Sequence, residues 1–130
     1  MRVLVTGGAG FIGSHLVRRL LQTTGTTVVN LDALRYSGNP ANVADLVANP
    51  CYAFVHGDIG DGPLVRNILQ EHRIEYVINC AAETHVDRSI LDPAAFAQTD
   101  VIGTGVLLEA SRQFGVKRFL QVSTDEVYGS

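Results

Sequence analysis

Residues 5–13 read Val-Thr-Gly-Gly-Ala-Gly-Phe-Ile-Gly, and this run decides how the rest of the chain is interpreted. Its glycines Gly7, Gly10 and Gly13 have the spacing GxxGxxG, one residue longer at the first step than the GxGxxG turn of dinucleotide-binding domains. A short apolar segment precedes the run and an amphipathic one follows it, so it should join a strand to a helix. Gly7 then permits the tight bend, Gly10 lets backbone N–H groups approach a pyrophosphate, and Gly13 lets helix and sheet pack closely. The run predicts a nucleotide-binding turn, with an unliganded glycine-rich turn as the alternative.

Apolar runs alternate with amphipathic stretches along the whole chain, as in a parallel sheet covered by helices. Asp61 should cap one helix with Pro63 in its first turn, and Gly115 should end the last one. Right-handed crossovers then predict an α/β, Rossmann-type doubly wound parallel sheet of order 3-2-1-4-5, with helices on both faces. The predicted strands are 3–5, 27–31, 52–55, 76–78 and 118–122, and the predicted helices are 11–21, 41–48, 62–72 and 92–114.

Composition places the chain among globular proteins and predicts one domain over residues 1–130, since 46% of the residues are hydrophobic and 18% are charged. The net charge is −3 and no Lys/Arg cluster occurs, which argues against nucleic acid as a partner. Cys51 and Cys80 have no CxxC spacing and no neighbouring His pair, so neither a metal site nor a disulfide framework is expected. The apolar run at the N-terminus is too short for a signal peptide or a membrane span, so a cytoplasmic protein is expected.

An acidic residue ends the second predicted strand. Asp32 follows Gly13 at about the 20-residue distance at which a ribose-binding acid is expected. A carboxylate there accepts hydrogen bonds from both ribose hydroxyls and repels a 2′-phosphate, which favours NAD over NADP. Arg35 lies close by in the sequence and weakens this exclusion. A solvated loop acid is the alternative.

Two further segments are candidate cofactor contacts. Asp58 and Ile59 follow the third strand, where they could meet an adenine, although a purely structural turn is nearly as good an interpretation of Asp58. The small residues Cys80, Ala81 and Ala82 follow the fourth strand and would let a cofactor pass close to the backbone.

Residues 123–129 read Ser-Thr-Asp-Glu-Val-Tyr-Gly and follow the fifth strand. This places two adjacent carboxylates, Asp125 and Glu126, at the carboxyl end of a strand, where open sheets hold their chemistry. Neighbouring carboxylates in a partly desolvated cleft push their pKa values apart, so one can act as an acid and the other as a base. An acidic pair on a solvated loop is the alternative.

Together these motifs resemble the extended short-chain dehydrogenase/reductases, sugar-nucleotide enzymes with a Rossmann domain and a small C-terminal substrate domain. Within them, residues 31–39, 81–90 and 123–129 resemble the family of dTDP-glucose 4,6-dehydratases, and the resemblance covers essentially all 130 residues. It implies NAD as cofactor, dTDP-glucose as substrate and a homodimer of the full-length protein. The implied reaction, which belongs to deoxysugar biosynthesis, is oxidation at C4, elimination of water across C5 and C6, and hydride return to C6.

By this resemblance, Glu126 is the base that removes the C5 proton and Asp125 is the acid that protonates the departing C6 hydroxyl. Thr124 hydrogen-bonds the C4 oxygen and, with Thr84, contacts the substrate; the family often has serine at the latter position. The cofactor-binding residues implied are Gly7, Gly10, Phe11, Ile12, Gly13, Asp32, Ala33, Leu34, Arg35, Asp58, Ile59, Cys80, Ala81, Ala82 and Thr99.

The family's Tyr-xxx-Lys motif does not occur in these 130 residues, and Tyr128 has no lysine four positions later. The chain is therefore expected to be an N-terminal cofactor-binding fragment that lacks the substrate domain and has no turnover alone. UDP-glucose 4-epimerases and UDP-glucuronate decarboxylases are disfavoured because they need no acid–base pair for an elimination. GDP-mannose 4,6-dehydratase usually prefers NADP, which Asp32 disfavours. A non-catalytic dinucleotide-binding module remains an alternative of another class.

Overall fold

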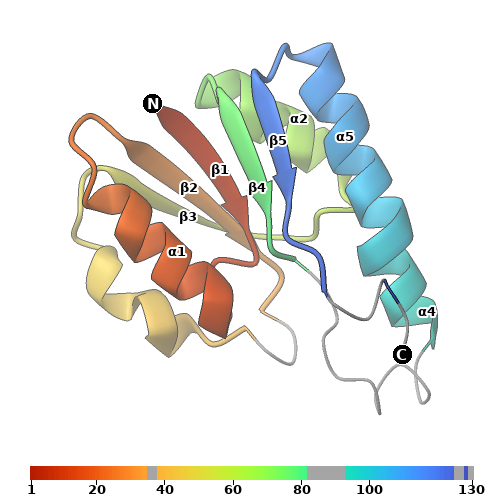
Figure 1. The fold of residues 1–130 in the computed structure, drawn as a ribbon, viewed down its shortest axis with the longest axis horizontal. Coiled ribbons are helices and arrows are strands. Elements are labelled where there is room, and N and C mark those ends of the chain that lie inside the picture. The colour runs from red at the N-terminus through yellow and green to blue at the C-terminus, as the bar shows by residue number, and fades with distance from the viewer. Residues whose placement is uncertain (35–37, 82–92, 125–127, 129–130) are drawn as a thin grey trace.

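The computed structural model describes residues 1–34, 38–81, 93–124 and 128, and in this part of the chain five parallel strands form one sheet. The strand order is β3-β2-β1-β4-β5, as predicted, and every neighbouring pair is parallel (Figure 1). The carboxyl ends of all five strands therefore lie along one edge of the sheet. The strands are β1 (Arg2–Thr6), β2 (Thr27–Asp32), β3 (Tyr52–His56), β4 (Tyr76–Asn79) and β5 (Arg118–Gln121).

Helices cover both faces of the sheet. On one side lie α1 (Phe11–Leu21) and the 3₁₀-helix η1 (Pro40–Leu46), and on the other lie α2 (Gly62–Glu71) and α5 (Thr104–Gln113) (Figure 1). Alternate strand residues point to opposite faces, so β1 sends its buried residues into two separate cores. The first core contains Val3, Val5, Val17, Val28 and Val43, and the second contains Leu4, Val29, Val65, Val77 and Leu107. Because both faces of the central strands β1 and β2 are buried, these two strands are mostly apolar in the sequence.

Two predicted helices differ in type from the structure. The segment predicted as one α-helix over 92–114 begins with α4 (Pro93–Phe96), continues as the π-helix η2 (Ala97–Gly103), and becomes α-helical again in α5. The segment predicted as an α-helix over 41–48 is the 3₁₀-helix η1. Apolar spacing over so few residues does not separate these helix types, because their periods differ by less than one residue per turn.

The predicted helix ends are confirmed where capping residues signalled them. The Asp61 carboxylate accepts a hydrogen bond from the backbone N–H of Leu64 at 3.2 Å, with Pro63 in the first turn of α2. Gly115 follows α5 with a φ of +68°, the left-handed conformation that lets the chain leave a helix.

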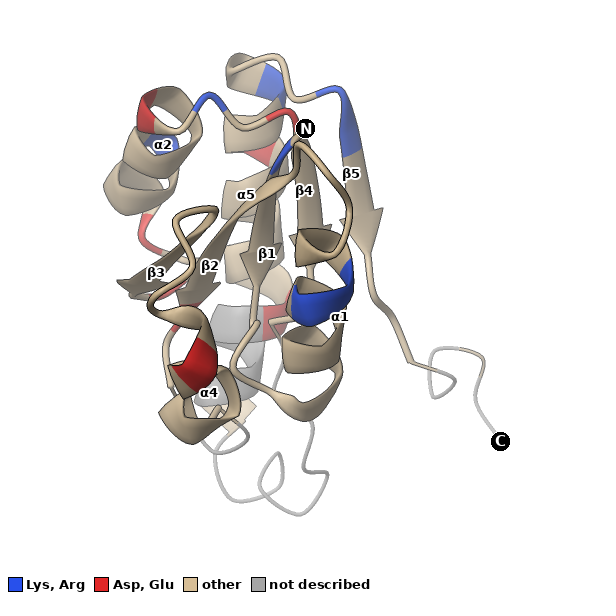
Figure 2. Ribbon diagram, turned by 90° about the vertical axis from the view of Figure 1, so that its left-hand side faces the viewer, with Lys and Arg blue, Asp and Glu red and all other residues tan. Residues whose placement is uncertain are grey.

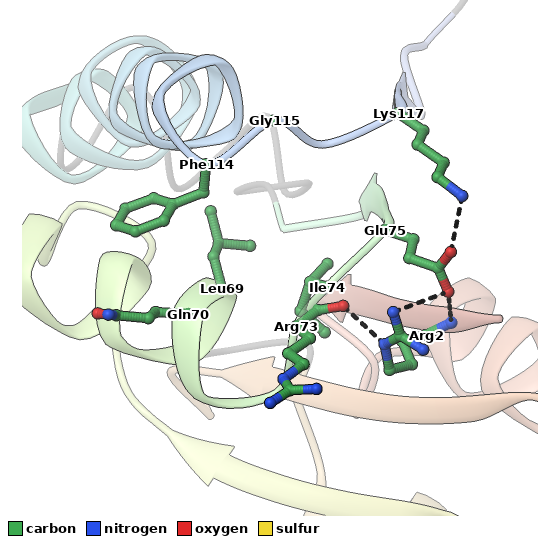
Figure 3. Close-up of a pocket in the computed structure, with 9 residues that line it drawn as sticks. All are labelled: Arg2, Leu69, Gln70, Arg73, Ile74, Glu75, Phe114, Gly115 and Lys117. Atoms are coloured by element: carbon green, nitrogen blue, oxygen red, sulfur yellow. Dashed lines mark hydrogen bonds and ion pairs between the residues drawn. The ribbon is translucent and has the colours of Figure 1, made fainter.

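At the amino edge of the sheet, Glu75, the residue before β4, bonds to the first residue of β1 and to the residue before β5. Its carboxylate accepts hydrogen bonds from the backbone N–H of Arg2 at 3.0 Å and from Nζ of Lys117 at 2.9 Å. Basic and acidic residues lie together at this end of the molecule, close to the N-terminus (Figure 2). Beside them is a pocket of about 400 Å³ between the ends of α2 and α5, whose rim includes Arg73 (Figure 3).

Replacing Glu75 by Gln should flatten the loss of stability in acid. The hydrogen bond from Lys117, helped by the one from Arg2, holds the pKa of the Glu75 carboxyl below its ordinary value of 4.5. A carboxyl whose pKa is lowered on folding contributes stability above its unfolded pKa, and this contribution disappears as the pH falls through the folded pKa. Urea unfolding at a series of pH values from 7 to about 3 should therefore show a shallower decline for Glu75→Gln. The exposed Glu71, which accepts a hydrogen bond from Asn67 at 3.3 Å, provides the control Glu71→Gln; equal acid slopes in both variants would contradict the prediction.

Candidate functional site

The glycine turn lies between β1 and α1, at the carboxyl edge of the sheet. Gly7 has a φ of +70°, and a Cβ atom there would lie 2.8 Å from backbone atoms of Cys80 and Ala81. A Cβ on Gly13 would lie 2.1 Å from the carbonyl oxygen of Gly7. Both positions thus require glycine because backbone passes directly over them.

The start of α1 is open to an anion. Gly10 occupies the N-cap position and no side chain in the described part of the chain caps the first turn, so α1 begins with backbone N–H groups that have no side-chain acceptor there. Phe11 and Ile12, the first two residues of the helix, are 78% and 63% exposed. N–H groups and the helix dipole together favour a negatively charged group such as a phosphate at this position.

The Asp32 carboxylate lies directly beside this turn. One oxygen accepts the backbone N–H of Ala9 at 2.8 Å and the other accepts the N–H of Leu34 at 2.7 Å, and the residue is only 7% exposed. Each carboxylate oxygen has a second lone pair, so a ribose hydroxyl can still donate to it. Ala33 follows in the same segment, and its carbonyl oxygen lies 3.1 Å from a ring nitrogen of His56.

Asp58 and Ile59 take positions that also serve the fold. The Asp58 carboxylate accepts the backbone N–H of Gly60 at 2.8 Å, which forms a local turn. The Ile59 side chain is buried in the core beneath α2. A contact of either residue with an adenine stays a prediction.

A row of polar side chains under the site, buried at Thr6 and Asn79, is not among the site residues predicted from the sequence. The Asn79 side chain, fully buried, accepts hydrogen bonds from the Thr6 hydroxyl and from the N–H of Ala81. It donates to the side-chain oxygens of Gln121 at 2.8 Å and Thr104 at 3.4 Å. Thr6, Asn79 and Gln121 are register partners, each the last residue of its strand. The sequence signal that could have revealed this row is a polar residue at the end of each of three apolar runs.

Cys80 follows Asn79 and packs against the glycine turn. Burial raises the pKa of its thiol to about 11, so the thiol stays protonated near neutral pH and is not suited to be a nucleophile. Its backbone carbonyl and the N–H of Ala81 form the surface on which Gly7 lies.

The structure thus gathers the predicted glycines, Asp32, Cys80 and Ala81 at one edge of the sheet. Thr124 is exposed and follows β5 at the same edge, after Val122, whose N–H donates to the carbonyl of Asn79 at 3.1 Å. The predicted site residues that lie outside the described part of the chain are Arg35, Ala82, Thr84, Asp125, Glu126 and the side chain of Thr99.

Other kinds of site find no support in the described segments. Within residues 1–34, 38–81, 93–124 and 128, no three His, Cys, Asp or Glu side chains are grouped as a metal site would require. None of the helices described is long and apolar enough to cross a membrane. The pocket of Figure 3 lies at the opposite, amino edge of the strands and is separate from the glycine turn.

A 3-2-1-4-5 parallel sheet, a glycine turn at a helix N-terminus and an acid at the end of β2 define the Rossmann-type domain of the extended short-chain dehydrogenase/reductases. Within that class, the chain belongs to the GDP-mannose 4,6 dehydratase family, whose sequence model matches residues 4–130.

Known proteins similar to this chain include both dehydratases and epimerases. A dTDP-glucose 4,6-dehydratase of Xanthomonas campestris is 54% identical over 98% of this chain and 38% of its own length. The crystal structure of DesIV, a dTDP-glucose 4,6-dehydratase of Streptomyces venezuelae with NAD bound, is 50% identical with a TM-score of 0.93, covering 100% of this chain and 41% of that one. A UDP-glucose 4-epimerase of Thermotoga maritima is 43% identical with a TM-score of 0.85, covering 95% of this chain and 38% of that one. The chain therefore spans about two fifths of the length of these relatives.

Proposed function

We propose that residues 1–130 form the NAD-binding Rossmann domain of a dTDP-glucose 4,6-dehydratase. The observation that carries the proposal is the Asp32 carboxylate held 2.8 Å from the Ala9 N–H, next to the uncapped start of α1. This arrangement provides a pyrophosphate site and a ribose acceptor side by side, and it fits the NAD found in DesIV. A homodimeric, cytoplasmic enzyme without a nucleic-acid partner is the accompanying prediction.

In this proposal the chain's own residues bind the cofactor and handle two protons. The chemistry that NAD supplies when bound is reversible hydride transfer. The turn from Gly7 to Gly13 holds the pyrophosphate and Asp32 holds the adenosine ribose. Thr124 donates to the C4 oxygen of the sugar, Glu126 removes the C5 proton, and Asp125 gives a proton to the departing C6 hydroxyl. The family's Tyr-xxx-Lys motif does not occur in residues 1–130, so these residues alone should have no turnover.

Incubation of the complete protein with NAD and dTDP-glucose tests the reaction. The proposal expects dTDP-4-keto-6-deoxyglucose, detected by mass spectrometry as loss of one water from the substrate. Conversion of UDP-glucose to its C4 epimer without loss of water would instead support the epimerase alternative. The similarity to the Thermotoga enzyme shows that the fold alone does not separate the two, whereas the adjacent carboxylates Asp125 and Glu126 favour elimination.

Asp32 should make the protein prefer NAD to NADP. In calorimetric titrations of the complete protein, Asp32→Asn should weaken NAD binding by roughly tenfold, because a hydrogen bond to a charged acceptor is worth about 1–1.5 kcal/mol more than one to a neutral acceptor. NADP binding should not weaken, since the variant no longer repels a 2′-phosphate. Asparagine can accept only one of the Ala9 and Leu34 N–H groups, and alanine accepts neither, so Asp32→Ala should weaken NAD binding further while narrowing the preference for NAD over NADP. Asp61→Asn, at the cap of α2, is the control; equal affinity of the parent protein for both cofactors would contradict the role of Asp32.

A further inference from the structure

The peptide groups around Ala9 are held by side chains from two other elements. The Ala9 carbonyl oxygen accepts the side-chain N–H of Asn42 at 2.8 Å and the backbone N–H of Asn39 at 3.1 Å. Its N–H donates to Asp32, so both polar groups of Ala9 are bonded within the protein. The neighbouring N–H of Gly8 donates at 2.9 Å to the side-chain oxygen of the fully buried Asn30.

Asn42 is itself fixed in place by α1. The Arg18 guanidinium donates at 2.5 Å to the backbone carbonyl of Asn42 and at 2.6 Å to the Asp45 carboxylate. The 3₁₀-helix η1 is thereby attached to the helix whose N-terminus follows the glycine turn. The Asn42 side chain in turn donates to the Ala9 carbonyl. Arg18 of α1, Asn42 of η1 and Ala9 of the turn are thus linked by consecutive hydrogen bonds.

The direction of the Ala9 carbonyl matters for an anion at the start of α1. A peptide unit carries its C=O and N–H on opposite sides, so rotation of the Ala9–Gly10 peptide would exchange the directions of the two groups. The N–H of Gly10, on the other side of this peptide, donates to the Gly7 carbonyl at 3.2 Å. The rotation would therefore turn the Ala9 carbonyl toward another carbonyl oxygen and break the turn that leads into the first N–H groups of α1. The two hydrogen bonds to the Ala9 oxygen oppose that rotation before any ligand arrives.

We infer that Asn42 is a positioning residue for the pyrophosphate turn: it holds the Ala9 carbonyl toward η1 so that the turn is ready for a diphosphate. This inference rests on the proposed NAD site and adds to it a residue that does not touch the ligand. A turn ordered in advance binds more tightly because less conformational freedom is lost on binding.

The test compares two ligands of the complete protein. Asn42→Leu keeps the size of the side chain but removes the donor, and it should weaken NAD, measured by calorimetry, by roughly 3- to 10-fold, the value of one neutral hydrogen bond. Adenosine, measured by ligand-observed NMR, has the ribose hydroxyls but no phosphate, so its affinity should not change. Asn42→Gln retains an amide donor and should recover part of the NAD affinity. Asn67→Leu, on the exposed face of α2, is the matched control.

A second measurement does not depend on NAD. In the ligand-free protein, amide hydrogen exchange at Ala9 and Gly10 should be faster in Asn42→Leu than in the parent, because the turn is less restrained. Unchanged exchange, or an equal loss of affinity for NAD and adenosine, would overturn the inference. Failure of the parent protein to bind NAD would instead contradict the proposed function, while the exchange data would still decide the role of Asn42.

Discussion

Glu126→Gln in the complete protein is expected to stop the reaction after its first hydride transfer. If Glu126 is the base at C5, the variant can still oxidise C4 but cannot begin the elimination. Absorbance of NADH should then rise and remain when dTDP-glucose is added, because hydride return to C6 requires elimination first. Loss of a general base lowers the rate by roughly 10²–10⁴, so the stalled state should be easily measured by stopped-flow spectroscopy.

Asp125→Asn separates the roles of the two carboxylates. If Asp125 protonates the departing hydroxyl, this variant should also slow the elimination, but a substrate with fluoride at C6 should largely restore it, since fluoride needs less protonation to leave. Exchange of the C5 hydrogen with solvent should survive in Asp125→Asn and be lost in Glu126→Gln. Exchange that survives only in the Glu126 variant would show that the two roles are reversed.

Gly13→Ala is expected to disrupt the glycine turn and to abolish NAD binding. The new Cβ would lie 2.1 Å from the Gly7 carbonyl oxygen and 2.9 Å from the Cα of Gly8. These are backbone atoms of the turn that follows β1, so no side chain can rotate away to make room. Added methyl groups in packed regions usually cost about 1–3 kcal/mol, and contact with fixed backbone puts this variant at the upper end or beyond. Calorimetry should show no detectable NAD binding, and urea unfolding should show the lowered stability.

Gly105→Ala provides the matched control for this prediction. Gly105 lies in α5, and a Cβ there would meet no atom within 4 Å. The same substitution should therefore raise stability by up to about 1 kcal/mol, because alanine favours the helix over glycine. Equal unfolding free energies for the two variants would show that the close approach at Gly13 is not tight in solution.

The sequence predicts those parts of the site whose signal is local. The strand order follows from the alternation of apolar and amphipathic segments, and the turn follows from the spacing of Gly7, Gly10 and Gly13. Asp32 is found because a single strand separates it from the first helix. In each case the residues that carry the signal lie within about one strand–helix unit of each other.

The supporting contacts of the turn could not be predicted in this way. Asn30 and Asn42 bond to Gly8 and Ala9 across 22 and 33 positions of the sequence. An asparagine in a strand or after a loop has no spacing that indicates its partner, and the partner here is a backbone group, which every residue has. The change to a π-helix in η2 is likewise invisible, since the apolar positions fit either helical period.

The polar row beneath the site constrains how the sequence can change over evolutionary time. Asn79 uses all four hydrogen-bonding positions of its amide, two as acceptor and two as donor. An apolar replacement of Asn79 alone would leave the buried Thr6 hydroxyl without this acceptor, at a cost of about 1–3 kcal/mol. Gln121 is exposed, so water can replace its lost partner. Thr6 and Asn79 should therefore be inherited as a pair, each substitution being tolerated only in the background of the other, and position 121 should keep an acceptor as long as the buried Asn79 donates to it.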